Sequence, residues 1–316
     1  MFRRFAAAAV AIFLSATAVL AAEPTVSAQW LREHVTDPNI VLVDIRAVEP
    51  GGQKNAYEEA HIPGAQHADY FQAGWRQKRD GVPGLLPGKM AIENLAGSLG
   101  IDETKHVVII WGGEDNNEFG AAARVYWTLK VYGHDNISIL DGGQAAWVKA
   151  GYLTQKGKSP QVAPAIFEAT LRPELHANID RVKKLVGTTD AVLLDARPPE
   201  FYAGKQKHDA AQAYGHLPGA QSLPHDAAFA PGSTKLKSRE ELAKAFAPVA
   251  DGQVVSYCNT GHWAATNWFV LSEVLGRQNV ALYDGSMVEW SKDPSRPIES
   301  SRTRLDDIKK MLRIGS

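Results

Sequence analysis

The chain has 316 residues, of which 45% are hydrophobic and 22% charged, and its formal net charge at pH 7 is −1. This composition is ordinary for a globular protein, and the length suits about two domains with a core each. The near-neutral charge, without a run of basic residues, disfavours a nucleic-acid-binding protein. A single cysteine excludes a framework of intramolecular disulfides, so stability must come from packing.

The first 22 residues have the pattern of a secretory signal peptide. Two arginines precede an apolar stretch over residues 5–20, and the small residues Ala21 and Ala22 follow it. We predict cleavage after one of these alanines and an exported protein, periplasmic or secreted, without stable membrane association after cleavage. The alternative is an uncleaved membrane anchor, which the shortness of the apolar stretch disfavours.

The remaining sequence repeats three motifs in the same order. They are an apolar run ending in Asp-x-Arg (41–46 and 192–197), a His-x-Pro-Gly-Ala turn (61–65 and 216–220) and an Asp-Gly segment followed by tryptophan (139–147 and 282–290). The apolar runs that begin at Val107 and Val254 add a fourth landmark. Such ordered self-similarity divides the chain into two halves of the same design.

Each half is predicted to contain the same succession of elements. A helical segment, 26–34 or 178–186, precedes the first apolar run, and further helices alternate with the later runs. Short apolar runs that alternate with helices indicate an α/β fold whose parallel sheet is buried on both faces. We predict an N-terminal domain at 23–155, a linker at 156–172, a C-terminal domain at 173–300 and a tail at 301–316.

The only cysteine, Cys258, stands where a nucleophile would be placed. It ends the apolar run 254–257, and after a short loop a helical pattern extends from Trp263 to Gly276. Unpaired N–H groups and the positive end of the helix dipole would there favour a thiolate or a bound oxyanion such as sulfate, thiosulfate or phosphate. We interpret the segment as an anion-binding loop formed by Asn259, Thr260, Gly261, His262 and Trp263.

The repeat separates the two halves chemically. When the runs 107–110 and 254–257 are aligned, Trp111 lies opposite Cys258. The N-terminal half therefore lacks a nucleophile there and is expected to shape or cover the site. The alternative interpretation of Cys258 is a small buried hydrophobic residue, as most free cysteines are. The loop and helix that follow it favour a reactive thiol.

In this order and spacing, the motifs resemble the tandem, two-domain form of the rhodanese family of sulfurtransferases, here in an exported bacterial form. The resemblance covers residues 25–300. It rests on the Asp-x-Arg strand ends, the Gly-His-x-Pro-Gly-Ala turn at 215–220, the Cys-x-x-Gly loop at 258–261 and the Tyr-Asp-Gly-Ser-x-x-Glu-Trp segment at 283–290.

The resemblance implies two tandem rhodanese-like domains, each a parallel five-stranded sheet with helices on both faces. It also implies that Cys258 takes a sulfur atom from a small anionic donor, thiosulfate or 3-mercaptopyruvate, as a persulfide. A thiol, a protein thiol or cyanide would then accept that sulfur in a second step. The loop N–H groups of residues 259–263 would stabilise the thiolate and the persulfide. No metal or organic cofactor is implied.

The chain departs from the family pattern at two positions. Members usually have Arg or Thr where this chain has Trp263, and the two-domain enzymes often have Arg where it has Phe201. Two contacts to an anionic donor are thereby absent. The candidate substrate contacts are Arg197, Phe201, Lys205 and Trp111. Further sources of positive charge are Lys207, His208 and His262, although each of these is equally consistent with an ordinary solvated side chain.

Several motif residues have simpler interpretations because they recur in the half without a cysteine. Asp195 and Arg197 match Asp44 and Arg46, which favours a structural ion pair. Asp284 precedes a glycine at a strand end and is expected to organise a turn or cap a helix.

Two other functions are considered. A cysteine phosphatase or arsenate reductase uses a related loop, but a phosphatase loop ends in an arginine and this one does not. A non-catalytic persulfide carrier or partner-binding rhodanese module is favoured by the missing donor contacts. It is disfavoured by the retention of Cys258 in a loop before a helix.

Overall fold

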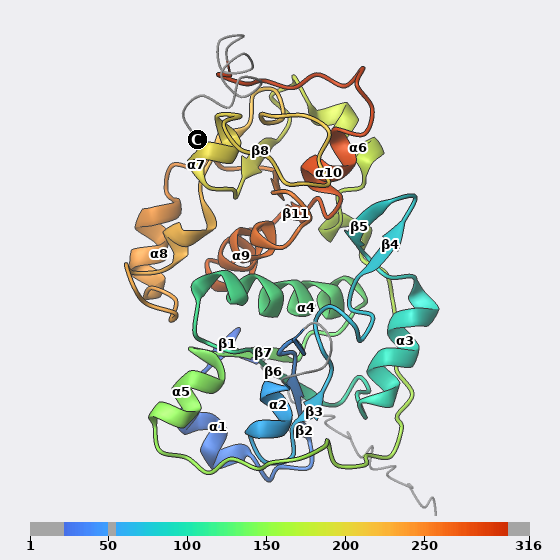
Figure 1. Ribbon diagram of the computed structural model, residues 1–316, viewed down its shortest axis with the longest axis vertical. Helices are drawn as coiled ribbons and strands as arrows, with labels where there is room; N and C mark the ends of the chain where they lie inside the picture. Colours follow the sequence, from blue (N-terminus) through green and yellow to red (C-terminus); the bar gives the residue numbers. More distant parts are fainter. Residues whose placement is uncertain (1–21, 50–54, 303–316) are drawn as a thin grey trace, which may run out of the picture.

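The computed structural model describes residues 22–49 and 55–302. The predicted signal peptide, apart from its last residue, and most of the predicted tail lie outside the described residues. Within the described chain no helix is long and apolar enough to cross a membrane. Two α/β halves stand one above the other, with two helices between their sheets (Figure 1).

The first half is built on a five-stranded sheet in which every pairing is parallel, in the order β1-β7-β6-β2-β3. Its alternating side chains belong to two hydrophobic clusters on opposite faces. On β6 (His106–Ile110), Val107 and Ile109 pack with the helix α4 (Phe119–Val131), whereas Val108 and Ile110 pack with residues of other helices. The remaining elements are β1 (Thr25–Val26), α1 (Ala28–His34), β2 (Ile40–Asp44), α2 (Ala56–Glu59), β3 (Gln66–His67), α3 (Lys89–Ser98), the 3-10 turn η1 (Asn116–Glu118), β7 (Ile137–Leu140) and α5 (Gly143–Lys149).

The second half repeats this design with the parallel order β11-β10-β8-β9. A single parallel bridge from His176 to Leu282 occupies the fifth position, where the first half has β1. The strand is this short because the 3-10 turn η2 (Pro173–Leu175) comes directly before it. The remaining elements are α6 (Ile179–Leu185), β8 (Val192–Asp195), α7 (Pro199–Tyr202), β9 (Gln221–Ser222), η3 (His225–Ala228), α8 (Arg239–Phe246), β10 (Val254–Tyr257), α9 (Trp263–Phe269), its π-helical continuation η4 (Val270–Val274), β11 (Val280–Leu282) and α10 (Ser286–Trp290).

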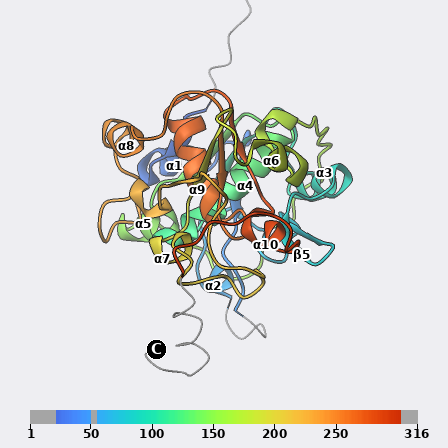
Figure 2. The ribbon, with the colours of Figure 1, turned by 90° about the horizontal axis from the view of Figure 1, so that it is seen from above.

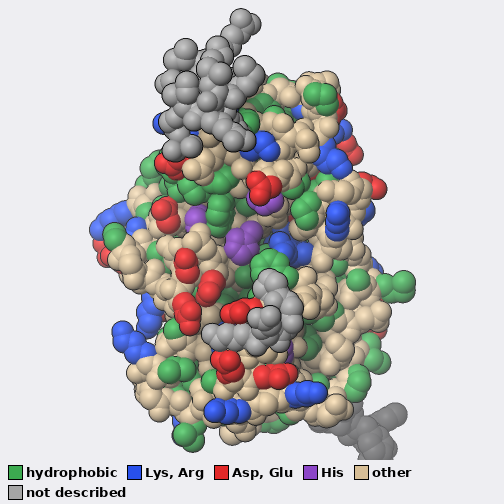
Figure 3. All heavy atoms as spheres, in the orientation of Figure 1, with side chains coloured by type: hydrophobic (Ala, Val, Ile, Leu, Met, Phe, Trp, Pro, Cys, Tyr) green, Lys and Arg blue, Asp and Glu red, His purple; other side chains and the backbone are tan. Residues whose placement is uncertain are grey.

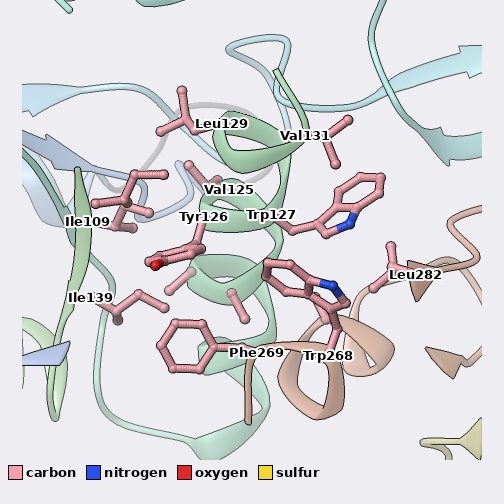
Figure 4. Packing of buried hydrophobic residues seen from close by; sticks show 14 of the residues in the cluster. Ile109, Val125, Tyr126, Trp127, Leu129, Val131, Ile139, Trp268, Phe269 and Leu282 are labelled. Carbon is pink, nitrogen blue, oxygen red and sulfur yellow. The ribbon is translucent and has the colours of Figure 1, made fainter. Parts of the chain in front are cut away.

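The two halves share one hydrophobic core. The helices α4 and α9 pack against each other between the sheets, and both ribbon views place them together (Figure 2). Figure 4 shows Tyr126 and Trp127 of α4 beside Trp268 and Phe269 of α9, with ring centroids of Tyr126 and Phe269 5.0 Å apart. Burying four large aromatic side chains at this interface stabilises the relative position of the halves.

A hairpin of the first half also reaches the second. The strands β4 (Gln77–Arg79) and β5 (Val82–Leu85) are antiparallel, and Val82 and Leu85 pack against Val288 of α10. The hairpin thus places the backbone of Leu86, the residue that follows β5, against Asp284 in the loop after β11.

Candidate active site

Cys258 follows the central strand of the second sheet at its carboxyl end. Strand β10 is buried along its whole length, and Cys258 itself is 1% exposed. The Cys258 N–H donates to Ser286 Oγ at 3.0 Å, and its carbonyl accepts a hydrogen bond from the Met287 N–H at 3.1 Å. These bonds attach the start of the loop to α10 and leave the thiol at the sheet edge where parallel α/β sheets bind ligands.

The loop after Cys258 presents backbone donors without acceptors. In the part of the chain that the structure describes, the N–H groups of residues 259–263 donate to no protein acceptor. Gly261 permits this path with φ +73°, and a Cβ there would lie 2.6 Å from Arg124 Nη1 and 2.8 Å from Asp284 Cα. The predicted helix then extends from Trp263 through η4 and stops near Gly276, which also has positive φ.

Arg197, a predicted substrate contact, is committed to the protein. It is 2% exposed and holds Asp195 through two nitrogens, at 2.9 and 2.6 Å. It also donates to Gly215 O at 2.8 Å and, at 3.4 Å, to Asn259 Oδ1. The geometry agrees with a structural ion pair that positions the loop residue next to Cys258.

A buried ionic group joins the halves behind the loop. Arg124 of α4 is fully buried, donates to Gly84 O at 2.8 Å and lies 3.7 Å from Asp284 Oδ2. Asp284 also accepts hydrogen bonds from the Leu86 N–H at 2.6 Å and from His176 Nε2 at 2.9 Å. Burial by itself raises the pKa of Asp284, but His176 and Arg124 hold it below its usual range. The turn role expected for Asp284 is present, as a bond from the Gly285 N–H, but its contacts with Leu86 and Arg124 also bind the two halves together.

His262 is neutral in this environment and is therefore no source of charge. Its Nε2 lies 2.9 Å from the carbonyl oxygen of Asn117, so Nε2 carries the proton and donates it. Nδ1 then accepts from the Tyr70 hydroxyl at 3.1 Å. Burial is the main cause that lowers the pKa of His262 to about 4. Both partners belong to the first half, so this histidine connects the loop after Cys258 to that half.

The two positions that depart from the family pattern touch each other. Trp263 and Phe201 meet edge to face with ring centroids 5.8 Å apart, and His225 stacks on Trp263 with ring centroids 5.1 Å apart. His225 Nε2 lies 3.0 Å from Asn117 Oδ1, and burial lowers the pKa of His225. Aromatic side chains therefore occupy both positions at which this chain departs from the family pattern.

The rhodanese-like domain family matches residues 27–150 and 178–293 of the chain. Over 313 residues the chain is 30% identical to thiosulfate/3-mercaptopyruvate sulfurtransferase 1, mitochondrial, of Arabidopsis thaliana, covering 90% of this chain and 80% of that protein. This chain belongs to the rhodanese family. Sulfur carrier protein TtuD of Thermus thermophilus is 32% identical over 290 residues, which are 87% of this chain and 96% of TtuD.

The solved structure of the 3-mercaptopyruvate sulfurtransferase SseA from Escherichia coli matches this rhodanese with a TM-score of 0.72 and 29% identity. The match covers 84% of this chain and 98% of SseA. The predicted fold of two tandem rhodanese domains is thereby confirmed, and the protein is a sulfurtransferase.

The first half of this rhodanese contains a cavity of about 790 Å³ at the corresponding sheet edge. Trp111, Arg46 and Glu118 line it, and Tyr70 and His262 contribute to its wall. Figure 3 shows acidic and histidine side chains on this face of the molecule, close to the junction between the halves. Across the described residues, no group of three or more His, Cys, Asp or Glu side chains is placed to hold a metal ion.

Two other predicted substrate contacts make no hydrogen bond to the loop 259–263 within the described part of the chain. Trp111 is 1% exposed, and its Nε1–H donates to Leu140 O at 2.9 Å within the first half. Lys205 is exposed in the turn after α7, where its backbone N–H donates to Glu200 O. A substrate role for either side chain stays a prediction.

Sequence reasoning missed the residues that the first half contributes to the site, chiefly Tyr70, Arg76, Asn117 and Arg124. One of them had a signal in the sequence. Arg124 is a basic residue in the middle of the apolar pattern of α4, and a charged residue on a buried face usually has a partner. Tyr70 and Arg76 lie outside helices and strands and Asn117 lies in the short turn η1, and no sequence pattern there points to the second half.

Proposed function

We propose that this rhodanese moves sulfane sulfur from a small anionic donor, thiosulfate or 3-mercaptopyruvate, through a persulfide on Cys258 to an acceptor. The acceptor is a thiol, a protein thiol or cyanide. The observation that carries the proposal is the placement of Cys258 before a loop whose N–H groups at 259–263 have no acceptor among the described residues.

The reaction divides into two balanced steps. The Cys258 thiolate attacks the outer sulfur of thiosulfate, the sulfur–sulfur bond of the donor breaks, and sulfite leaves with the bonding electron pair. With 3-mercaptopyruvate the carbon–sulfur bond breaks, and the leaving carbanion takes a proton to become pyruvate. An acceptor thiolate or cyanide then attacks the outer sulfur of the persulfide and regenerates the Cys258 thiolate.

The chain's own groups support these steps through fixed electrostatics. The N–H groups of residues 259–263 are proposed to hold the negative charge of the thiolate and then of the terminal persulfide sulfur. Arg197 is proposed to act as a positioning residue, because its hydrogen bond to Asn259 holds the start of the loop. No metal or organic cofactor takes part in the proposed reaction.

We also propose the site of action and the boundaries of the working protein. A signal peptide over residues 1–22 would direct the chain to the periplasm or the medium, and the mature protein would have no stable membrane association. The two domains, 23–155 and 173–300, would be joined by a linker at 156–172. Fractionation of a bacterial host and N-terminal sequencing of the exported chain test this, and an uncleaved chain in the membrane fraction contradicts it.

A second candidate function is that of a persulfide carrier or a partner-binding rhodanese module. The contact between Trp263 and Phe201 favours it, because aromatic rings occupy positions where family enzymes often have donor-binding cations. The relative TtuD is named a sulfur carrier protein. A carrier would accept one sulfur and keep it until a specific protein thiol arrived, whereas an enzyme would turn over with small thiols.

Intact-protein mass spectrometry distinguishes these candidates. The mature chain is incubated with thiosulfate or 3-mercaptopyruvate, and its mass is measured before and after addition of dithiothreitol or cyanide. We expect a gain of one sulfur atom on Cys258, removed by the acceptor. A sulfur gain that small thiols and cyanide do not remove would favour the carrier. No gain with either donor would contradict the proposed enzyme.

A further inference from the structure

Among the residues that the structure describes, Arg76 is a cation at the junction of the halves that has neither a hydrogen-bond acceptor nor an ion-pair partner. Its guanidinium stacks on the rings of Tyr70 and Phe71, with Cζ 4.1 and 5.2 Å from the ring centroids. Its Nε is buried and lacks a hydrogen-bond partner. Within residues 22–49 and 55–302 none of its nitrogens donates a hydrogen bond or forms an ion pair. Arg76 as a whole is half-buried, and leaving its buried Nε without an acceptor costs free energy, so a ligand that supplies acceptors to this guanidinium would bind favourably.

The position of Arg76 points it toward the catalytic loop. Gly84 has φ +80°, and a Cβ built on it would lie 3.5 Å from both Arg76 Nη1 and Thr260 Cβ, so these two side chains approach each other over this glycine. The stacking partner Tyr70 donates its hydroxyl proton to His262. Arg76 therefore faces the loop of Cys258 from the opposite half of the molecule.

Among Arg76, Arg124 and Arg197, the arginines described around the loop, only Arg76 lacks a neighbouring carboxylate that compensates its charge. Arg197 is neutralised by Asp195 at 2.6 Å, and Arg124 is opposed by Asp284 at 3.7 Å. His262 carries no charge at neutral pH, because it donates through one nitrogen and accepts through the other. Arg76 has no carboxylate partner among the described residues. Its charge is free to attract an anion.

We propose that Arg76 binds the anionic group of the sulfur donor, a sulfonate or a carboxylate, and so supplies from the first half a positive charge that Phe201 and Trp263 do not. The planar guanidinium suits such oxyanions because it donates two parallel hydrogen bonds to them. This inference rests on the proposed function of Cys258 and identifies a specificity-determining residue for it.

The first test measures anion recognition without sulfur transfer. Cys258 is the only cysteine, so alkylation by iodoacetate and by neutral iodoacetamide reports on this thiol alone. The quantity measured is the rate of alkylation by iodoacetate divided by the rate with iodoacetamide. We expect Arg76→Gln to lower this ratio about tenfold, since the substitution removes a cation near the incoming carboxylate. Arg76→Lys should recover part of the ratio. Lys78→Gln, an equal charge change at an exposed residue of the same hairpin, should leave it unchanged.

The second test separates the two half-reactions. Arg76→Gln should raise the thiosulfate concentration needed for half-maximal persulfide formation about tenfold, while dithiothreitol discharges the persulfide at the wild-type rate. A merely structural role would slow both steps. An unchanged alkylation ratio, or a thiol inert to both reagents, would overturn the assignment of Arg76. A changed ratio with no persulfide in the wild type would instead overturn the sulfur-transfer proposal and retain the anion site.

Discussion

The loop after the central strand occurs in both halves, but among the described residues only the loop of the first half has a carboxylate that accepts hydrogen bonds from its N–H groups. In the first half, Glu118 Oε2 accepts hydrogen bonds from the N–H groups of Gly113 at 3.0 Å and Glu114 at 3.4 Å. Its carboxylate lies over Gly112, where a Cβ would be 2.4 Å from that oxygen. In the second half no carboxylate of residues 22–49 or 55–302 accepts from the loop 259–263, and Cys258 stands at the start of this loop.

This difference shows how one fold supports both a structural and a chemical loop. Anion-binding backbone donors are present after the central strand of each sheet, because the strand–loop–helix path is repeated. The Glu118 carboxylate occupies them in the first half, whereas those in the second half have no acceptor among the described residues, as the proposed binding of a thiolate, a persulfide or an oxyanion requires. The first half instead contributes side chains, such as Tyr70 and Arg124, to the other loop.

The largest expected effect concerns the residue that distinguishes the loops. Cys258→Ser should abolish persulfide formation and lower sulfur transfer by at least about a thousandfold, because the hydroxyl does not supply a thiolate. The fold should persist, since serine is nearly the same size, and circular dichroism with thermal unfolding checks this. Transfer at a rate near that of the wild type would show that another group is the nucleophile.

The next effect concerns the path of the catalytic loop. Gly261→Ala should lower the free energy of unfolding by about 2–4 kcal/mol, because it adds a clash with Arg124 and Asp284 to the strain of a positive φ. Gly219→Ala is the matched control, with φ +72° and no atom within 4 Å of the added Cβ, and should cost only about 1 kcal/mol. Urea unfolding measures both. Equal losses of unfolding free energy in the two variants would show that the close approach of Gly261 to Arg124 and Asp284 adds no destabilisation.

A pH-dependent effect tests the tie between the halves. The folded state lowers the pKa of His262 to about 4, from about 6.5 in the unfolded chain. The unfolded state therefore binds the proton first, and the stability contribution of neutral His262 is fully present above about pH 6.5 and lost as pH falls to about 4. Replacement by glutamine removes this titration. Its unfolding free energy should fall less steeply between these pH values, and parallel curves would contradict the neutral assignment.

The smallest effect concerns the loop of the first half. Glu118→Ala leaves the N–H groups of Gly113 and Glu114 without their acceptor and should lower the unfolding free energy by about 1–2 kcal/mol. Millimolar sulfate should then raise the melting temperature of the variant more than that of the wild type, with chloride at equal ionic strength as the control. An identical response of both proteins would mean that this loop does not bind anions when emptied.

Much of the fold was predictable because it follows from local patterns. The apolar run 254–257 is a strand buried on both faces, and the helical pattern after Trp263 ends near the positive-φ Gly276. The repeated motifs predicted two domains of one design. The length of the fifth strand of the second sheet was not predictable. Only His176 pairs there, directly after the 3-10 turn η2, and no sequence pattern indicates so short a pairing.

The sequence by itself determined the two-domain α/β fold, the lone thiol and its place before a helix, because strand and helix periodicities and a repeat are properties of neighbouring residues. Only the tertiary structure decided which charges surround that thiol. Tyr70, Arg76 and Arg124 reach the loop from the other half because α4 packs against α9 and the β4–β5 hairpin packs against α10. Contacts between residues so far apart in the chain depend on the packing of whole elements, which no local pattern specifies.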